Sequence, residues 1–186
     1  MTSGTDRRTR IADAVITVLA ERGSRGLTHR AVDEEAGLPM GSTSYYHRSR
    51  AELLHAAVPR LAELDSGNLP RKAAVSLRDA LVTTLDRSLR GAGYTRTLAR
   101  YELVLEASRR PRLQEDLASG TEQLLSLLTD QFDELRAADG ASRARDVLAF
   151  LDGLMLAQVT SPAERRRTPA ELEAAITRFV DSMEGP

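Results

Sequence analysis

Residues 27–54 read LTHRAVDEEAGLPMGSTSYYHRSRAELL, and this stretch decides the fold. Thr28 is a preferred N-cap residue, so a short helix is expected to begin just after it. Gly37 is expected to end that helix, because glycine tolerates the positive φ that a tight turn needs. Residues 40–47 then predict a second short helix, which carries small polar side chains and two tyrosines.

The segments on either side of this stretch are expected to be longer helices. Upstream, apolar residues fall on one helical stripe, which consists of Ile11, Val15, Val18 and Leu19. Downstream, Ser49 and Glu52 form a capping box that opens a further helix. Two short helices joined by a tight turn, behind a longer helix, are the layout of a helix-turn-helix. The sequence therefore predicts a helix-turn-helix domain over 1–49 and a connecting helix over 50–66.

The rest of the chain is also expected to be helical. Turn formers at 66–70 mark the start of a second domain over 67–186. Five further helices are expected there, or four if two of them fuse, over roughly 71–91, 95–109, 111–137, 141–160 and 168–183. Thr168 and Glu171 form a second capping box. The alternating pattern of a strand is missing, so the fold class is all-α with about nine helices.

Composition narrows the class of protein further. The chain has 186 residues and no cysteine, which excludes disulfides and thiolate metal sites. It has no apolar run of about 18 residues and no secretory signal, so we expect a cytoplasmic protein without a membrane span. Residues 1–60 hold nine arginines and seven acids, a net of +2, against −3 over 61–186. This small asymmetry has the sign expected if the N-terminal part meets phosphate.

The helix-turn-helix also carries a family resemblance. Its shared features are Thr28 at the start of the second helix, an Ala-Gly turn, Gly41 in the recognition helix, the aromatic Tyr46 at its end, and a serine with a basic residue opening the fourth helix. On these features residues 6–66 resemble the DNA-binding domain of the TetR family of regulators. The resemblance implies a three-helix DNA-binding domain, followed by a helical bundle that binds a ligand and forms a dimer.

The resemblance further implies which residues meet double-stranded DNA. Thr28 and Tyr46 would bind phosphates, and Arg50 would bind the DNA backbone from the start of the fourth helix. Arg30 and Arg48 would add backbone contacts, which position a protein without reading sequence. The residues expected nearest to the bases are Met40, Ser42, Thr43 and Tyr45.

Residues 67–186 resemble the family only loosely, as expected for the part that varies with the ligand. The candidate residues for a small-molecule cavity are Tyr101, Glu102, Leu105, Leu128, Phe132, Asp152, Leu154 and Gln158. The apolar members could equally be core, and each of the two acids either reads a polar ligand or pairs with a nearby arginine. Gly153 and Ala157 are small enough for close helix approach, and the resemblance implies that the last two helices pack against their twins in a homodimer.

These expectations combine into a homodimeric repressor that a small-molecule effector releases from a palindromic operator. No cofactor is expected, and the spacing of the three histidines fits no metal-ligand motif. Two other classes stay open. One is a small helical enzyme with Glu102 or Asp152 as general base, although no catalytic spacing supports it. The other is a protein-interaction module that has kept the helix-turn-helix fold without affinity for DNA.

Overall fold

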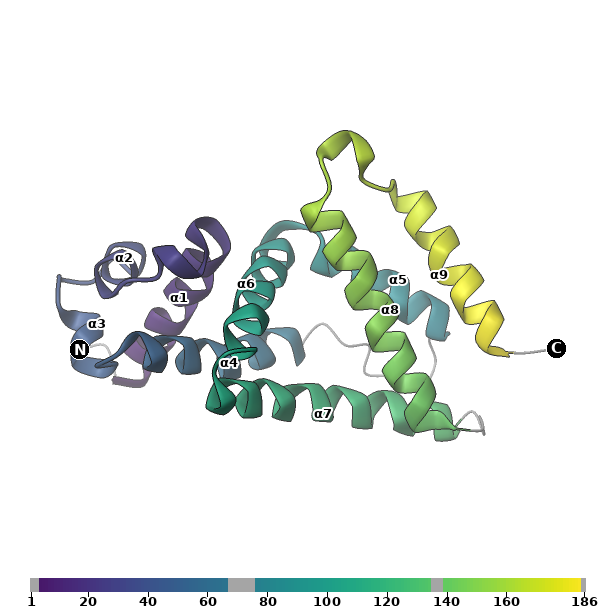
Figure 1. Cartoon of the computed structure of the whole chain (residues 1–186), viewed down its shortest axis with the longest axis horizontal. Coiled ribbons are helices and arrows are strands. Elements are labelled where there is room, and N and C mark those ends of the chain that lie inside the picture. Colours follow the sequence, from purple (N-terminus) through teal and green to yellow (C-terminus); the bar gives the residue numbers. More distant parts are fainter. Residues whose placement is uncertain (1–3, 67–75, 135–138, 185–186) are drawn as a thin grey trace. The chain divides into compact units, whose positions relative to one another are not determined.

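The computed structural model describes residues 4–66, 76–134 and 139–184. Within these residues the chain forms helices and no strand (Figure 1). The elements are α1 (Gly4–Gly26), α2 (His29–Glu35), α3 (Ser42–Tyr46), α4 (Arg50–Ser66), α5 (Leu77–Ser88), α6 (Gly91–Ala107), α7 (Pro111–Glu134), α8 (Gly140–Thr160), the 3-10 helix η1 (Ala163–Arg165) and α9 (Pro169–Glu184). The all-α fold class is confirmed. None of these helices is both long and apolar enough to cross a bilayer.

Most predicted helices agree with the structure, and the differences at their ends have local causes. α3 is shorter than the predicted 40–47, because Gly41 takes a φ of 90° and stands just outside the helix. α6 begins at Gly91, earlier than expected. Residues 67–75 and 135–138 lie outside the described part of the chain. The domain boundary predicted at 66–70, the start of the helix expected from 71 and the end of the helix expected to reach 137 fall there.

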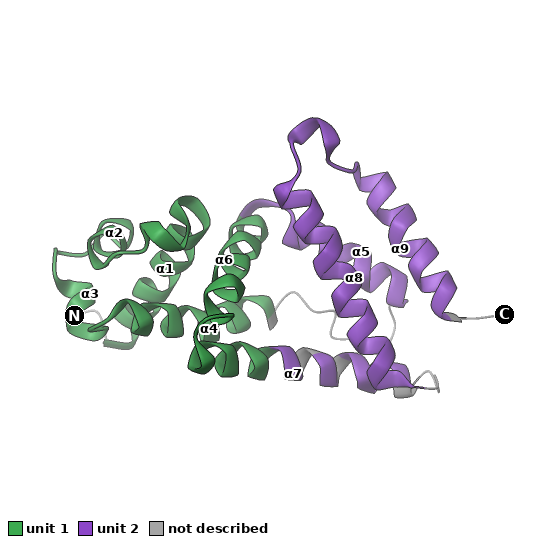
Figure 2. Ribbon diagram, viewed as in Figure 1, with its two compact units in different colours: residues 1–67, 92–120 green, residues 68–91, 121–186 purple. Residues whose placement is uncertain are grey.

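The chain divides into two compact units (Figure 2). Unit 1 comprises residues 1–67 and 92–120, and unit 2 comprises residues 68–91 and 121–186. Unit 1 therefore holds the predicted helix-turn-helix and connecting helix, and it also takes in α6 and the first part of α7. The predicted domains were continuous in sequence, whereas unit 1 is built from two separate segments.

The core of unit 1 forms where α1 packs against α2 and α4, and α6 adds to it. The apolar stripe predicted on the first helix is buried, at 1% exposure or less, and consists of Ile11, Val15, Val18 and Leu19. Leu53 and Leu54 of α4 and Leu103 of α6 are buried in the same cluster. Each such side chain stabilises the fold by about 1.5–3 kcal/mol relative to an exposed one. This core gives the two short helices a rigid support.

Unit 2 is held together by a core of its own. α5 packs against α8 and α9, and the buried apolar residues of these helices include Leu81, Leu85, Val147, Leu151, Ile176 and Val180. Phe150 of α8 stacks on Phe179 of α9, with ring centroids 4.0 Å apart. Arg78 of α5 pairs with Asp181 of α9 at 2.8 Å between Nη2 and Oδ1. These contacts tie the last helix to the first helix of the unit.

The capping box predicted at the start of the last helix is present. The Thr168 amide donates to Glu171 Oε2 at 2.7 Å, and the Glu171 amide donates to Thr168 Oγ1 at 3.3 Å. Each residue thus satisfies a backbone donor that the helix itself leaves open.

Candidate nucleic-acid interface

α2 and α3 form the expected helix-turn-helix. Thr28 caps α2, because its hydroxyl oxygen accepts from the Ala31 amide at 3.1 Å. Gly37 takes a φ of 60° just after α2, as the turn requires. α1 closes the other end of α2, since Arg10 Nη2 donates to the Ala36 carbonyl oxygen at 2.6 Å. The ends of α2 are therefore fixed before any partner binds.

Asp33 of α2 holds the start of α3. Its side chain is buried, Oδ2 accepts from the Gly41 amide at 2.7 Å, and Oδ1 accepts from the Thr43 amide at 2.8 Å and the Thr43 hydroxyl at 2.5 Å. Burial by itself would raise the pKa of this carboxyl, but the bonds from Thr43 and Gly41 outweigh burial and hold the pKa below its usual range. We did not predict this role. The feature of the sequence that could have revealed this role is an acidic residue directly after Ala31 and Val32, which were expected to face inward.

Thr43 corrects one of the predicted base contacts. Its side chain is fully buried, and its hydroxyl is donated to Asp33. A buried side chain of this length does not reach a base edge in a groove. Thr43 therefore orients α3 and does not read DNA.

The outward face of the helix-turn-helix carries the other predicted DNA contacts. Met40 is 78% exposed and Tyr45 is 81% exposed, which is unusual for apolar side chains of this size. Ser42 lies beside them and is half-buried. Thr28, Arg30 and Arg48 are exposed at the ends of the short helices. These side chains are free to contact phosphates and base edges.

Tyr46 stands at the end of α3 between an aromatic ring and a cation. Its ring lies edge-on to Tyr45, with centroids 5.2 Å apart at 85°. The guanidinium carbon of Arg8 lies 5.7 Å from the centroid of the Tyr46 ring. Arg8 belongs to the first turns of α1, and we did not predict it near the interface. Only the folded contact between α1 and α3 brings this arginine to the recognition helix.

Arg50 was expected to bind the DNA backbone, and the structure turns it toward the interior of unit 1. Its Nη2 donates to the Ser24 carbonyl oxygen at 2.7 Å and also contacts the Ser24 hydroxyl. Its Nη1 lies 3.4 Å from Glu106 Oε2 on α6. Protein acceptors thus occupy the guanidinium here, because Glu106 supplies a carboxylate within its reach. No local pattern predicts that a residue 56 positions away would bind this side chain.

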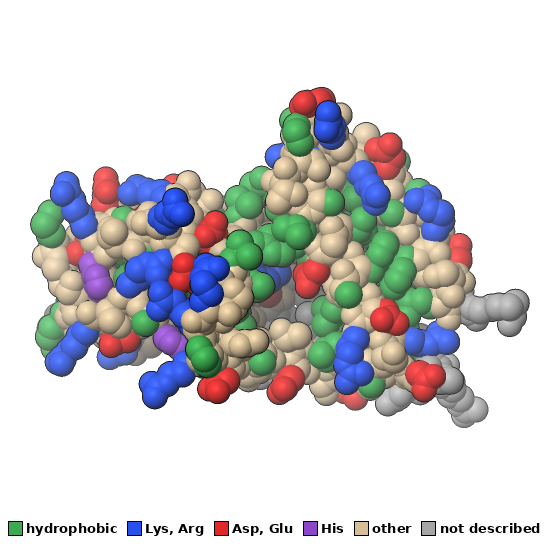
Figure 3. All heavy atoms as spheres, in the orientation of Figure 1, with side chains coloured by type: hydrophobic (Ala, Val, Ile, Leu, Met, Phe, Trp, Pro, Cys, Tyr) green, Lys and Arg blue, Asp and Glu red, His purple; other side chains and the backbone are tan. Residues whose placement is uncertain are grey.

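Arginines are spread over the surface of unit 1, and acidic side chains stand between them (Figure 3). Some of these arginines are paired. Arg22 lies 3.6 Å from Glu34, and Arg60 of α4 binds Asp13 of α1 at 2.7 Å. Pairing of this kind reduces the local positive potential around these arginines.

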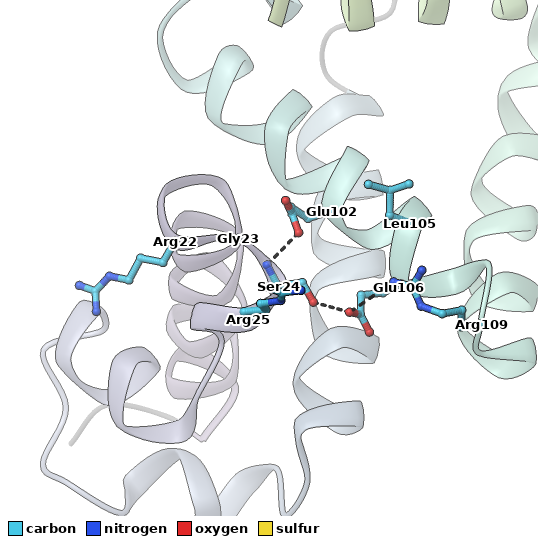
Figure 4. A pocket seen from close by; sticks show the side chains of 8 residues that line it. All are labelled: Arg22, Gly23, Ser24, Arg25, Glu102, Leu105, Glu106 and Arg109. Atoms are coloured by element: carbon cyan, nitrogen blue, oxygen red, sulfur yellow. Dashed lines mark hydrogen bonds and ion pairs between the residues drawn. The ribbon is translucent and has the colours of Figure 1, made fainter. Parts of the chain in front are cut away.

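A cavity of about 320 Å³ lies between the end of α1 and α6 (Figure 4). It is lined by Arg22, Gly23, Ser24, Arg25, Glu102, Leu105, Glu106 and Arg109. Two candidate ligand residues, Glu102 and Leu105, thus share one cavity. One alternative paired Glu102 with a nearby arginine, but Arg96 and Arg100 both pair with Asp65 of α4. Glu102 Oε2 accepts from the Ser24 amide at 2.8 Å instead.

The other candidate ligand residues do not gather at this cavity. Phe132 and Leu154 are buried in unit 2, Leu128 and Tyr101 are half-buried, and Asp152 is exposed. Gln158 was predicted to line the ligand cavity, but both ends of its side-chain amide are bound to the backbone of Arg167. Nε2 donates to the Arg167 carbonyl oxygen at 2.9 Å, and Oε1 accepts from the Arg167 amide at 2.8 Å. Gln158 therefore ties α8 to the segment before α9.

Comparison with known proteins agrees with this architecture. Residues 72–182 match the family described as "Tetracyclin repressor-like, C-terminal domain". The HTH-type transcriptional regulator PksA of Bacillus subtilis (strain 168) is 26% identical over 191 residues, which cover 95% of this chain and 89% of that protein.

Two solved structures are similar over nearly their whole length. A member of the TetR family from Streptomyces coelicolor A3 is 30% identical, with a TM-score of 0.75, over 94% of this chain and 98% of that one. The multidrug binding protein EbrR complexed with ethidium is also 30% identical, with a TM-score of 0.72, over 93% of this chain and 98% of that one. The match over residues 72–182 covers more than half of the chain, and the helix-turn-helix precedes it in the expected place. The chain belongs to the TetR family of transcriptional regulators.

Proposed function

We propose that this protein binds operator DNA through α2 and α3 and that a small molecule changes its affinity for that DNA. The observation that carries the proposal is the contrast between the two faces of α3. The inner face is fixed by Asp33 and the buried Thr43, while Met40 and Tyr45 stand 78% and 81% exposed on the outer side. A rigid short helix with an uncovered outer face is suited to a major groove.

The side chains of this face divide into two roles. We expect base edges near the exposed Met40, which lies just before α3, the half-buried Ser42 at its start and the exposed Tyr45 near its end. Tyr45 offers a hydroxyl, Ser42 a short donor and acceptor, and Met40 an apolar contact for a thymine methyl group. We assign phosphate contacts to the exposed Thr28, Arg30 and Arg48 and to the half-buried Tyr46, which lie at the ends of the short helices.

We further propose that two copies of the chain bind the operator together. The α8 surface offers an exposed patch of small and apolar residues, made of Gly153, Leu156 and Ala157. Leu156 is 46% exposed, and nothing lies within 4 Å of a Cβ built on Gly153. A twin helix could approach this patch closely. Two heads in one dimer would then bind half-sites about 34–36 Å apart on a palindrome.

The effector is proposed to bind the C-terminal part of the chain, residues 67–186. Its binding would release the protein from DNA, which makes the protein a repressor. Two candidate ligand residues of this part, Glu102 and Leu105, line the cavity of about 320 Å³, and that volume lies in the range of small-molecule sites. EbrR, with its bound ethidium, favours a planar aromatic cation as the first compound to test. Because chromosomal DNA is the proposed partner, we expect the protein to act in the cytoplasm.

Selection of bound duplexes from a random DNA pool tests the proposal. We expect a palindrome, together with an affinity that falls steeply with salt, because phosphate contacts release counterions. Tyr45→Ala should change which sequence is selected, whereas Tyr46→Phe should weaken binding to all duplexes alike. If no duplex is retained even at low salt, DNA binding is wrong and the interaction-module alternative gains. Turnover of a compound by the purified protein would favour the enzyme alternative.

A further inference from the structure

Four residues join the end of α1, the start of α4 and the end of α6, and we call them the Arg50 cluster: Ser24, Arg50, Glu106 and Arg110. Ser24 Oγ donates to Glu106 Oε1 at 2.5 Å (Figure 4). Arg50 donates to the Ser24 carbonyl oxygen at 2.7 Å and lies 3.4 Å from Glu106 Oε2. Arg110 Nε lies 2.9 Å from the same carboxylate oxygen. Glu106 is thus the shared acceptor of the cluster.

Glu106 carries its charge in a half-enclosed place. Its side chain is 14% exposed. The hydroxyl of Ser24, followed by the guanidinium groups of Arg50 and Arg110, outweighs burial and lowers the pKa of Glu106 to about 2. The carboxylate is therefore ionised near neutral pH. An ionised carboxylate that is largely shielded from water is destabilised unless a cationic group pairs with it.

Arg50 also stands next to the DNA-binding face along the chain. α3 ends at Tyr46, and Arg50 is the first residue of α4. The planar guanidinium fits carboxylate and phosphate oxygens with the same fork of donors. Donors directed at Ser24 and Glu106 are not available to a phosphate. A phosphate contact that uses Nη1 and Nη2 together therefore requires that these contacts in the cluster break.

We propose that Glu106 competes with DNA phosphate for Arg50, so that the Arg50 cluster holds the protein in a form with reduced affinity for DNA. This inference rests on the proposed DNA binding. It adds a named regulatory contact, in which Glu106 acts through Arg50 and does not itself touch DNA.

The position of Glu106 connects this competition to α6. Glu102 and Glu106 are one helical turn apart, and both bind Ser24, the first through its amide at 2.8 Å and the second through its hydroxyl. The C-terminal half of α6 is thereby fastened to the end of α1. Any shift of α6 changes how firmly Glu106 holds Arg50. Allosteric control of DNA affinity can act through this one contact, as a coupling between two sites.

The test compares four proteins on one selected operator duplex at one fixed salt concentration: the unchanged protein, Glu106→Gln, Arg50→Ala and the double variant. We expect Glu106→Gln to bind the duplex about 5-fold or more tightly than the unchanged protein. Arg50→Ala should bind more weakly, and adding Glu106→Gln to it should change nothing further, because the residue through which Glu106 acts is gone. Glu115→Gln, an exposed acid of the same unit, is the control for loss of one negative charge.

Each outcome of this test has a separate meaning. If Glu106→Gln binds no better than the unchanged protein, or strengthens binding equally without Arg50, the competition is wrong. If Glu115→Gln tightens binding as much, the effect is one of general charge and the proposal also fails. If the unchanged protein binds no duplex, the DNA-binding function itself is wrong. Should Glu106→Gln not fold, Ser24→Ala removes another acceptor of Arg50 in the cluster and should tighten binding in the same direction.

Discussion

At the residue scale, the Asp33 carboxylate lies against three donors at the start of α3. A short helix has little stability of its own, because its first hydrogen-bonded turn is costly to form. Gly41, the N-cap residue of α3, has no side chain to offer. Asp33 does the capping from another helix and so fixes both the start and the direction of α3.

Replacing Asp33 by asparagine should therefore weaken the fold and the DNA affinity together. We expect the free energy of unfolding to fall by about 1–3 kcal/mol, because buried donors lose a charged acceptor. Denaturant titration measures this loss. Glu34→Gln is the matched control, since Glu34 is the exposed neighbour with one long ion pair to Arg22 at 3.6 Å, and it should change stability by less than about 0.5 kcal/mol. Equal stability of the two variants would contradict the role given to Asp33.

Glu106 makes stability depend on pH, with a sign that follows from its lowered pKa. The folded pKa is about 2, against an ordinary value of 4.5. Its contribution is therefore fully present above the ordinary value and is lost as the pH falls toward the folded value. Between pH 7 and pH 3 the stability gap between the unchanged protein and Glu106→Gln should shrink, by an amount on the order of 1 kcal/mol. Denaturant titrations at several pH values measure the gap, and a constant gap would show that Glu106 is not held as an anion.

The contacts of Thr43 and Arg50 could not be predicted from the sequence. Thr43 and Tyr45 stand two positions apart in a polar segment, and both fitted a groove-facing role. Thr43 turned out to be buried because its hydroxyl meets Asp33, ten positions earlier. Arg50 likewise met Glu106 from a distant helix. A pattern of residue types shows which side chains are able to bind phosphate, but not which protein acceptor reaches them first.

At the scale of elements, the caps were predictable because they depend on neighbours in the chain. Thr28 caps α2 as expected, and Thr168 with Glu171 forms the reciprocal box at α9. The box at α4 is only half formed. The Glu52 amide donates to Ser49 Oγ at 3.2 Å, but the Glu52 carboxylate accepts from the Arg48 amide at 2.7 Å. The predicted start of α4 is correct, although the Glu52 carboxylate accepts from the amide of Arg48 and not from the amide of Ser49.

The cap of α9 gives a test at this scale. Thr168→Ala removes the acceptor of the Glu171 amide and should lower the free energy of unfolding by about 1 kcal/mol. The loss should appear in thermal melts followed by helical circular dichroism. Thr168→Ser keeps the hydroxyl and should retain most of the stability. If alanine and serine were equivalent there, the cap would not contribute to α9.

At the scale of the whole molecule, the all-α class followed from the sequence, but the composition of the two units did not. Leu103 reads as one more apolar residue of a C-terminal helix. It is fully buried in the cluster that also contains Leu19 and Leu53. Membership of a unit is decided by packing between segments that are distant in sequence, and periodicity within one helix carries no information about that.

The proposed dimer contact on α8 can be tested at the scale of the whole molecule. Leu156→Glu places a charge in the exposed patch with Gly153 and Ala157, so it should yield folded monomers and weaken operator binding. Light scattering after size-exclusion chromatography gives the mass. Ala163→Glu, at an exposed position of η1, should leave the dimer intact. A dimer that survives Leu156→Glu would place the interface elsewhere.

The burial of α6 side chains in unit 1 sets rules for engineering chimaeras of this regulator. Ala99, Leu103 and Ala107 complete the hydrophobic cluster behind the helix-turn-helix, and Arg96 fastens α6 to Asp65 of α4 at 3.0 Å. A fragment cut after residue 66 would leave that apolar surface open to water and prone to aggregate. A graft that joins this DNA-binding unit to the second unit of another protein must therefore keep residues 92–120 and make three splices, one on each side of α5 and one after residue 120.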